Sequence, residues 1–228
     1  MARYHDTFNM IKFRSMVVDA AKSGVNSSSS DDKRITPVGK FLRKYKIDEL
    51  PQILNVFLGD MSFVGPRPQV QAEADLYTEE EKKILSVRPG ITDLASIVFA
   101  DEGDILEGNS DPDLLYNQVI RPWKSRLALI YIQKSSLLFD IRLIYLTLLN
   151  VIDRQKVLLK IGDLLKGWNC DQTVIKIVRR DCQLYPYPPP GATEIVTSYP
   201  GSKLKSSNSK LSRQVFNKNE NQKNSLDI

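Results

Sequence analysis

Apolar residues at helical spacing predict two short helices in the first quarter of the chain. The first lies within residues 35–45, where Thr36 suits the N-cap position and Pro37 suits the first helical position. The second covers residues 48–57 and is amphipathic. Its apolar stripe consists of Leu50, Ile53, Leu54 and Phe57.

Alternation with period two predicts a small β-sheet. Residues 8–16 alternate between apolar and polar side chains, so Lys12 and Arg14 share one face of an expected strand. A solvated edge strand is the simplest interpretation of these residues, because basic side chains are mostly exposed. Residues 92–99 form the second expected strand, after a turn over residues 88–92.

The middle of the chain is predicted to be irregular between short helices. Thr78 and the glutamates after it resemble the capping box of a helix over residues 78–84. Residues 101–113 are acidic and typical of a loop, and residues 155–181 have room for one or two short helices.

Two longer helices are expected over residues 116–135 and 137–154. Their pattern leaves two interpretations open. The helices either form a hairpin that buries its own core, or they present a surface that also touches lipid headgroups, with Trp123 and Tyr131 near the boundary.

The character of the chain changes near Tyr185. Its run of prolines excludes a regular helix, and residues 202–228 are polar enough to predict disorder. The expected architecture is a compact, mostly helical α+β domain with a small β-hairpin or sheet, followed by a disordered C-terminal tail. We divide the chain into a domain over residues 1–156, a helical extension over 157–184, and the tail over 185–228.

Composition narrows the chemistry. The formal net charge is +5, which fits an anionic partner. Two cysteines and the single His5 argue against a disulfide scaffold, a zinc site and a Ser-His-Asp triad, so any metal is expected to be held by oxygen atoms, with magnesium the natural candidate. No apolar run is long enough to cross a bilayer, because Asp140 and Arg142 interrupt residues 137–152.

Adjacent carboxylates and a braced arginine point to phosphate chemistry. Asp48 and Glu49 stand side by side, and Arg67 lies between Pro66 and Pro68. Carboxylates that hold a divalent cation, together with arginines, neutralise the charge of a phosphate. The simpler interpretation of the acidic pair is an ordinary helix start, with Asp48 as the cap and Glu49 in the first turn.

Several ordered motifs in the first two-thirds of the chain resemble the bacterial sugar transferase family, whose members are monotopic polyprenyl-phosphate phosphoglycosyl transferases. The motifs are Arg3-Tyr4-His5, Ile11-Lys12-Phe13-Arg14-Ser15-Met16, Thr36-Pro37-Val38-Gly39-Lys40-Phe41-Leu42-Arg43, Asp48-Glu49-Leu50-Pro51-Gln52, Gly59-Asp60-Met61-Ser62-Phe63-Val64-Gly65-Pro66-Arg67-Pro68, Arg88-Pro89-Gly90-Ile91-Thr92 and Ser136-Leu137-Leu138-Phe139-Asp140.

The resemblance implies that a phospho-sugar passes from a UDP-sugar to a polyprenyl (undecaprenyl) phosphate, with release of UMP, as the priming step of exopolysaccharide, capsule or glycan synthesis. It implies that Asp48 is the nucleophile, that Asp48 and Glu49 hold Mg²⁺, and that the enzyme works at the cytoplasmic face of the inner membrane. The candidates for substrate binding are Lys12, Arg14, Arg43, Arg67 and Arg88.

Two departures from the family pattern set further expectations. The chain begins at the turn that follows the hydrophobic re-entrant helix of the family, so we expect that anchor to be missing. Ala100 stands where relatives carry an arginine, so nucleotide binding is expected to be weak or differently arranged. These departures support an alternative hypothesis, an inactive membrane-peripheral interaction module derived from the family. Nucleic-acid binding is a weaker alternative that no motif supports, and we expect no nucleic-acid partner.

Overall fold

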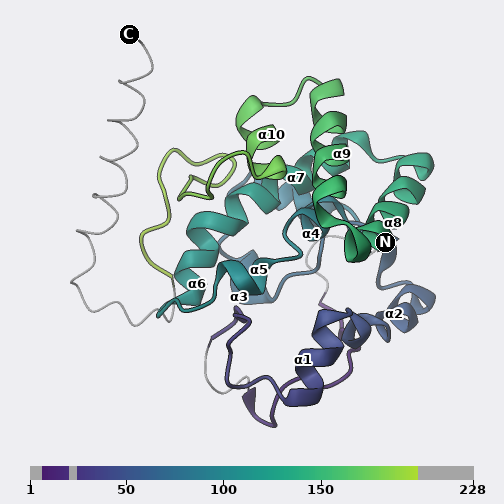
Figure 1. Ribbon diagram of the computed structural model, residues 1–228, viewed down its shortest axis with the longest axis vertical. Coiled ribbons are helices and arrows are strands. Elements are labelled where there is room, and N and C mark those ends of the chain that lie inside the picture. Colours follow the sequence, from purple (N-terminus) through teal and green to yellow (C-terminus); the bar gives the residue numbers. More distant parts are fainter. Residues whose placement is uncertain (1–6, 21–24, 200–228) are drawn as a thin grey trace.

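The computed structural model describes residues 7–20 and 25–199, and the expected disorder of residues 202–228 lies outside this part of the chain. Its helices and strands form a mostly helical α+β structure (Figure 1). In chain order they are α1 (Pro37–Lys44), η2 (Ile47–Glu49), α2 (Gln52–Leu58), β1 (Ser62–Val64), α3 (Gln71–Ala74), η3 (Glu81–Ser86), β2 (Gly90–Thr92), α4 (Leu94–Val98), α5 (Glu102–Ile105), α6 (Pro112–Leu115), η4 (Tyr116–Ile120), α7 (Arg121–Lys134), α8 (Leu137–Ile152), α9 (Arg154–Gly167) and α10 (Gln172–Arg179).

The small sheet is confirmed, but it is built from other segments than the two that we predicted. Strands β1 and β2 pair in parallel, with Ser62 opposite Gly90 and Val64 opposite Thr92. Their backbones approach closely just after β1, where a Cβ atom at Gly90 would lie 2.1 Å from the nitrogen of Gly65. Glycine is required there because any side chain would meet backbone. The turn predicted over residues 88–92 therefore ends in a strand.

The two predicted strands are wrong. Within residues 92–99 the chain forms α4, because Asp93 and Ser96 make a reciprocal capping box that starts a helix. Residues 8–16 are extended, and their one ladder contact is an isolated bridge between Met16 and Ile35. Local alternation predicted an extended backbone there, but it carries no information about a partner strand.

Helix α1 confirms its predicted cap, since the Thr36 hydroxyl accepts a hydrogen bond from the amide of Gly39 at 2.9 Å. The second predicted helix starts later than expected. Residues 47–49 form the short helix η2, and α2 begins only after Pro51, which occupies its N-cap position. Asp48 is therefore not a helix cap. The expected loop over residues 101–113 contains the one-turn helices α5 and α6.

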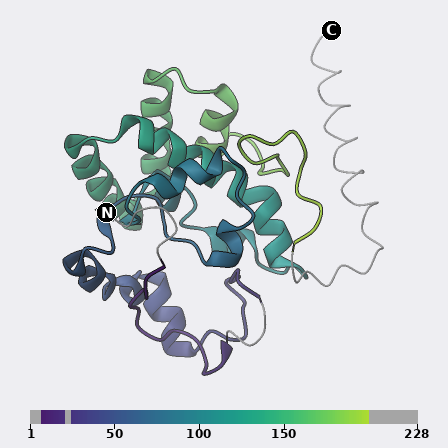
Figure 2. The same ribbon diagram turned by 180° about the vertical axis from the view of Figure 1, so that it is seen from behind.

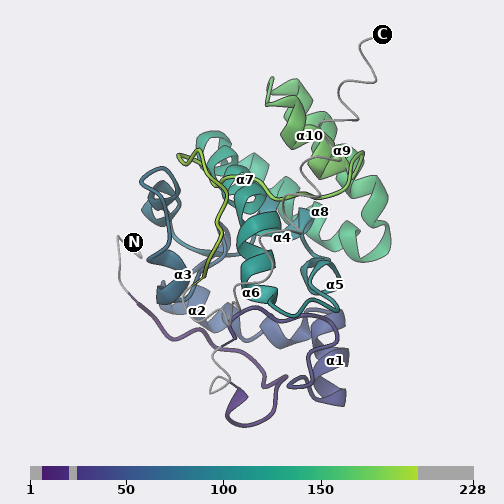
Figure 3. The ribbon, with the colours of Figure 1, turned by 90° about the vertical axis from the view of Figure 1, so that its left-hand side faces the viewer.

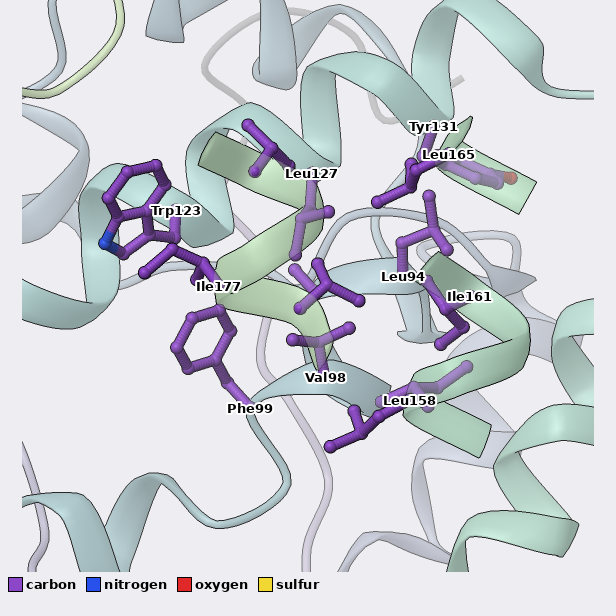
Figure 4. Close-up of a cluster of buried hydrophobic side chains, with 14 of the residues drawn as sticks. Leu94, Val98, Phe99, Trp123, Leu127, Tyr131, Leu158, Ile161, Leu165 and Ile177 are labelled. Carbon is purple, nitrogen blue, oxygen red and sulfur yellow. The ribbon is translucent and has the colours of Figure 1, made fainter. Parts of the chain in front are cut away.

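The hydrophobic core gathers side chains from α4, α7, α8, α9 and α10 (Figure 4). Leu94, Trp123 and Leu127 lie at most 1% exposed, beside Ile161 and Ile177 from the last two helices. Helices α9 and α10 therefore belong to the same core as the segments before residue 156. Figure 1 shows them at the end of the molecule opposite α1.

Of the two interpretations of the long helices, neither holds in full. Helix α8 packs mainly against α9 and contacts α7 near their junction, where the hydroxyl of Tyr131 donates to Asp140. Trp123 and Tyr131 are only 1% and 5% exposed, so they do not reach a lipid surface. Much of the outer face of α8 is nevertheless exposed and apolar.

The proline-rich segment after Cys182 has no regular helix and runs across α7 (Figure 3). The ring of Tyr187 stacks on Trp123 with centroids 4.4 Å apart, and the Arg126 guanidinium donates to the carbonyl of Pro188. Among the described residues, no helix is both long and apolar enough to cross a bilayer.

A buried ion pair fixes the segment before β2 to α7. Glu81 is fully buried and accepts from Arg121 at 2.5 and 3.0 Å and from the hydroxyl of Ser125 at 2.6 Å. Glu81 also forms the predicted capping-box bonds with Thr78. Its carboxylate accepts from the amide of Thr78, and the hydroxyl of Thr78 accepts from the amide of Glu81.

Replacing Glu81 is expected to destabilise the fold strongly. Glu81→Ala leaves Arg121 buried without its counter-charge and should lower the free energy of unfolding by about 3–5 kcal/mol. Glu79→Ala is the matched control, since the Glu79 side chain is 89% exposed, and should change it by less than about 0.5 kcal/mol. Urea unfolding of both variants measures the difference, and equal midpoints would contradict this account of the pair.

Candidate active site

The acidic pair lies on a tight turn between α1 and α2. Lys46 adopts the left-handed backbone conformation, with φ of 57°, and reverses the chain into η2. Such a conformation is uncommon outside glycine, and it occurs where the surrounding structure requires a sharp turn. The backbone carbonyl of Asp48 accepts from the amide of Phe13 at 3.0 Å, which holds the extended N-terminal segment against the turn.

Glu49 is the centre of a compact charged cluster. Both terminal nitrogens of Arg67 donate to its carboxylate, one of them at 2.9 Å. The ammonium of Lys12 lies 4.0 Å from the same carboxylate. Three segments that are distant in the sequence therefore meet at one carboxylate: the N-terminal segment, η2 and the loop after β1.

The cluster shifts the pKa values of its members. Burial alone would raise the pKa of Glu49, but Arg67 and Lys12 outweigh it and hold that pKa at about 2. Burial and the neighbouring Arg67 lower the pKa of Lys12 to about 8, although Glu49 acts in the opposite direction. The pKa of Arg67 is raised, because the charge of Glu49 outweighs its burial.

The loop that carries Arg67 is positioned by the sheet. The amide of Gly65 donates to the carbonyl of Thr92 at 2.9 Å, and the amide of Gly90 donates to the carbonyl of Pro66 at 3.0 Å. These backbone bonds continue the β1–β2 pairing past its last residue. As a result, the Arg67 side chain reaches Glu49 from a backbone that is held in place by the two residues before it.

Asp48 differs from Glu49 in forming no ion pair with any residue that the structure describes. The residue is 7% exposed, and its Oδ1 atom is buried without a hydrogen-bond partner in the described part of the chain. Gln52, one helical turn later, is fully buried, and neither its amide oxygen nor its amide nitrogen has a partner among residues 7–20 and 25–199. Unpaired buried polar atoms are costly and call for an explanation, and a bound ligand is one.

Of the other three residues predicted to bind substrate, the structure brings Arg43 to the cluster and leaves Arg14 and Arg88 outside it. The Nε atom of Arg43 donates to the hydroxyl of Ser15 at 3.0 Å, and its charge reaches Lys12, so Arg43 belongs to the cluster. Arg14 and Arg88 are exposed, and neither forms an ion pair with another described residue.

Sequence reasoning missed Gln52 and Asn55 as members of the site. Asn55 is 1% exposed, and its side chain accepts from the amide of Ile11 and donates to the carbonyl of Asn9, both at about 3 Å. It thereby holds the N-terminal segment that carries Lys12. The available signal was two amide side chains inside an apolar helical stripe, where polar residues are unusual.

Arg67 also lines a small cavity on the inner side of its loop. Asp93, Tyr116 and Lys124 line the same cavity, whose free volume of about 30 Å³ is close to that of one water molecule. Burial raises the pKa of Asp93, and it outweighs the capping bonds from Ser96 and the nearby charges of Lys124 and Arg67. This cavity is too small for a sugar or a nucleotide.

The acidic pair offers a partial set of ligands for a cation. No group of three or more His, Cys, Asp or Glu residues able to hold a metal exists among the described residues. Mg²⁺, however, is commonly bound by one or two carboxylates, with water and substrate phosphates completing its shell. The unpaired Oδ1 of Asp48 and the adjacent carboxylate of Glu49 fit such a site, with Glu49 shared with Arg67.

The model of the family described as bacterial sugar transferase matches residues 1–154. The chain belongs to the bacterial sugar transferase family. The matched region contains Lys12, the acidic pair and Arg67, and therefore the whole charged cluster.

Curated members of the family give the match its chemical context. The chain is 38% identical over 156 residues to a galactosyl transferase of Streptococcus agalactiae, covering 64% of this chain and 31% of that protein. It is 37% identical over 140 residues to the UDP-glucose:undecaprenyl-phosphate glucose-1-phosphate transferase of Escherichia coli, covering 60% and 28%. It is 37% identical over 121 residues to an N-acetylgalactosaminephosphotransferase of Aeromonas hydrophila that acts on undecaprenyl phosphate, covering 51% and 29%. The chain spans about a third of the length of these relatives.

The surroundings of Ala100 contain guanidinium groups from outside its own segment. Its neighbour Asp101 forms ion pairs with Arg154 at 2.8 Å and with Arg180 at 2.9 Å. Arg180 also lies over the ring of Phe99. Position 100 is therefore next to two arginines of the C-terminal helices, which share the carboxylate of Asp101.

Lys12 is expected to titrate about two pH units below an ordinary lysine. In reductively ¹³C-methylated protein, its NMR signal should move with a midpoint near pH 8, well below the usual lysine value of about 10.4. Glu49→Gln should lower the Lys12 midpoint further, because the carboxylate stabilises the ammonium form. A Lys12 midpoint near 10 in both proteins would contradict the described cluster.

Proposed function

We propose that this chain transfers a phospho-sugar from a UDP-sugar to a polyprenyl phosphate, with release of UMP. The observation that carries the proposal is the pairing of Glu49 with Arg67 and Lys12 beside the unpaired Asp48. Family membership supports it, since the Escherichia coli and Aeromonas hydrophila relatives are named for transfers to undecaprenyl phosphate. Its place would be the priming step of exopolysaccharide, capsule or glycan synthesis.

The reaction would proceed in two displacements at the phosphorus that bears the sugar. A carboxylate oxygen of Asp48 attacks this phosphorus, and the bond to the bridging oxygen breaks, so that UMP leaves with that oxygen. The phospho-sugar is then an acyl phosphate of Asp48. A phosphate oxygen of the polyprenyl phosphate attacks the same phosphorus, the bond to Asp48 breaks, and the carboxylate is restored.

The chain's own cations support attack by an anion on an anion. Arg67 and Lys12 neutralise Glu49 in the free protein. When the substrate binds, the same two cations would contact its phosphate groups. Arg43 adds positive charge on the same side of the turn. Arg14 and Arg88 lie exposed, and we propose that they contact the outer parts of the two substrates.

Mg²⁺ would be held by Asp48 and Glu49 and, when bound, would neutralise phosphate charge. The protein residues supply the remaining functions. Asp48 forms the covalent bond, Glu49 keeps Arg67 and Lys12 in place, and the backbone bonds around Gly65 and Gly90 fix the approach of Arg67.

The acceptor is a membrane lipid, so the protein would work at the inner membrane surface, on its cytoplasmic side. Two exposed apolar faces support this location. Helices α2 and α8 both lie along the right-hand side of Figure 1, which is the left-hand side of Figure 2. Their outward side chains include Leu54, Phe57, Leu58, Leu137, Leu138, Leu148 and Ile152, which are 54–84% exposed. Exposed apolar surface of this kind marks an interaction site.

The first test removes the proposed nucleophile. Asp48→Asn should lower the rate of UMP release from a UDP-sugar by at least about a thousandfold in the presence of magnesium and polyprenyl phosphate. Asp104→Asn, which changes an exposed carboxylate, is the matched control and should keep the wild-type rate. Undiminished release by the Asp48 variant would remove the mechanism, and a wild-type protein that does not bind UDP-sugar would favour the interaction module.

The second test addresses the membrane contact. Phe57→Ser and Leu138→Ser should each weaken partition onto lipid vesicles by roughly tenfold or more, since burying one such side chain contributes about 1.5–3 kcal/mol. Both side chains are more than 80% exposed, so the fold should tolerate the changes. Val70→Ser removes an exposed apolar side chain elsewhere and should bind like the wild type; sedimentation with vesicles measures all three.

A further inference from the structure

A groove opens where the end of α7, the start of α8 and the end of α9 meet. It is lined by Lys134, Ser136, Leu138, Phe139, Arg142, Leu164 and Trp168, and its volume is about 330 Å³. Leu164 and Trp168 lie beyond residue 154, outside the region that matches the family. The groove is also on a different part of the fold from Asp48 and Glu49.

The groove holds two cations without carboxylate partners. Neither Lys134 nor Arg142 forms an ion pair within the described residues, and both are exposed. None of the described residues that line the groove carries a carboxylate. The net charge at the groove is therefore positive, which selects an anionic ligand.

An indole lies beside these cations. The ammonium of Lys134 lies over the ring of Trp168, 5.9 Å from its centroid. The ring of Phe139 packs edge-on against the same indole, with 5.1 Å between the ring centroids. A tryptophan next to basic side chains is the combination found where proteins meet the headgroup level of a membrane. Lys160 and Tyr145 repeat the arrangement further along α8 and α9, with 5.6 Å between them.

The groove is continuous with an apolar surface. Leu138 lines it and is 81% exposed, and Leu137 beside it is 76% exposed. A ligand that fills this site therefore needs an anionic end for Lys134 and Arg142 and an apolar end for the start of α8. A free phosphate ion has only the first of these.

We propose that this groove binds the phosphate of an anionic phospholipid headgroup, while the acyl chains lie along the exposed face of α8. Lys134 and Arg142 contact the phosphate, and Trp168 packs at the headgroup level. The inference rests on the membrane contact proposed above and adds a preference for one lipid class. The site would hold the start of α8 at the surface without taking part in the transfer reaction.

The test compares vesicles of phosphatidylcholine with vesicles that contain phosphatidylglycerol. The wild-type protein should bind the anionic vesicles at least tenfold more tightly. Lys134→Gln with Arg142→Gln should weaken that binding roughly 20- to 30-fold, because each basic residue near an anionic surface contributes a factor of about five. Lys83→Gln with Lys176→Gln removes the same charge from η3 and α10 and should change binding less than fivefold.

Tryptophan fluorescence locates the contact. Trp123 is 1% exposed in the core, so quenching by brominated phosphatidylglycerol reports on Trp168. Trp168 should be quenched when the protein binds, and millimolar inorganic phosphate should not reverse the binding. Reversal by phosphate would overturn the proposal in favour of a free-anion site.

The remaining outcomes separate the two proposals. Equal effects of the two double variants, or an unquenched Trp168 in bound protein, would overturn the headgroup site and leave the membrane contact standing. A wild-type protein that binds no vesicles would contradict both. UMP release measured with acceptor in detergent reports on the transfer reaction alone, so it should be the same in the Lys134 and Arg142 double variant as in the wild type.

Discussion

The ion pair between Glu49 and Arg67 is the interaction on which the candidate site depends. It joins η2 to the loop after β1, and through Lys12 it also holds the N-terminal segment. The pair keeps two cations at the place where a phosphate would arrive, and it does so without occupying Asp48. Two neighbouring carboxylates thus have different surroundings, one paired with cations and one with an unpaired buried oxygen. In the mechanism that we propose, that difference separates the supporting role of Glu49 from the nucleophilic role of Asp48.

The fold divides its apolar side chains between an interior and an outer surface. The inner faces of α7, α9 and α10 close the core around Trp123, whereas α2 and much of α8 turn theirs outward. Phe57 and Leu138 are exposed, so the packing of the core does not depend on them. The same arrangement fits the proposed membrane contact, because the helix that follows the acidic pair is also one of the exposed apolar elements.

The family and most of the helices were predictable from the sequence, and the long-range contacts were not. Thr36 predicted its cap correctly, because capping depends on residues three positions apart. Thr78 and Glu81 form the predicted capping-box bonds, but helix η3 begins only at Glu81, so the helix predicted over residues 78–84 starts later than expected. Asp48 was wrongly given a capping role, because Pro51 takes the N-cap of α2. The sheet was misplaced because its strands have three residues each and are defined by the close approach of Gly65 and Gly90, which no local pattern reveals. The amide side chain of Gln52 inside an apolar stripe was a signal in the sequence, but its burial without a partner among the described residues could be seen only in the structure.

The most direct test of the account is mass spectrometry of the intact protein, quenched by acid-free denaturation after mixing with UDP-sugar and magnesium but no acceptor. We predict a mass increase of one phospho-sugar, mapped to Asp48, which disappears when polyprenyl phosphate is added. The absence of any adduct while UMP is still released, or an adduct mapped to Glu49, would contradict the account.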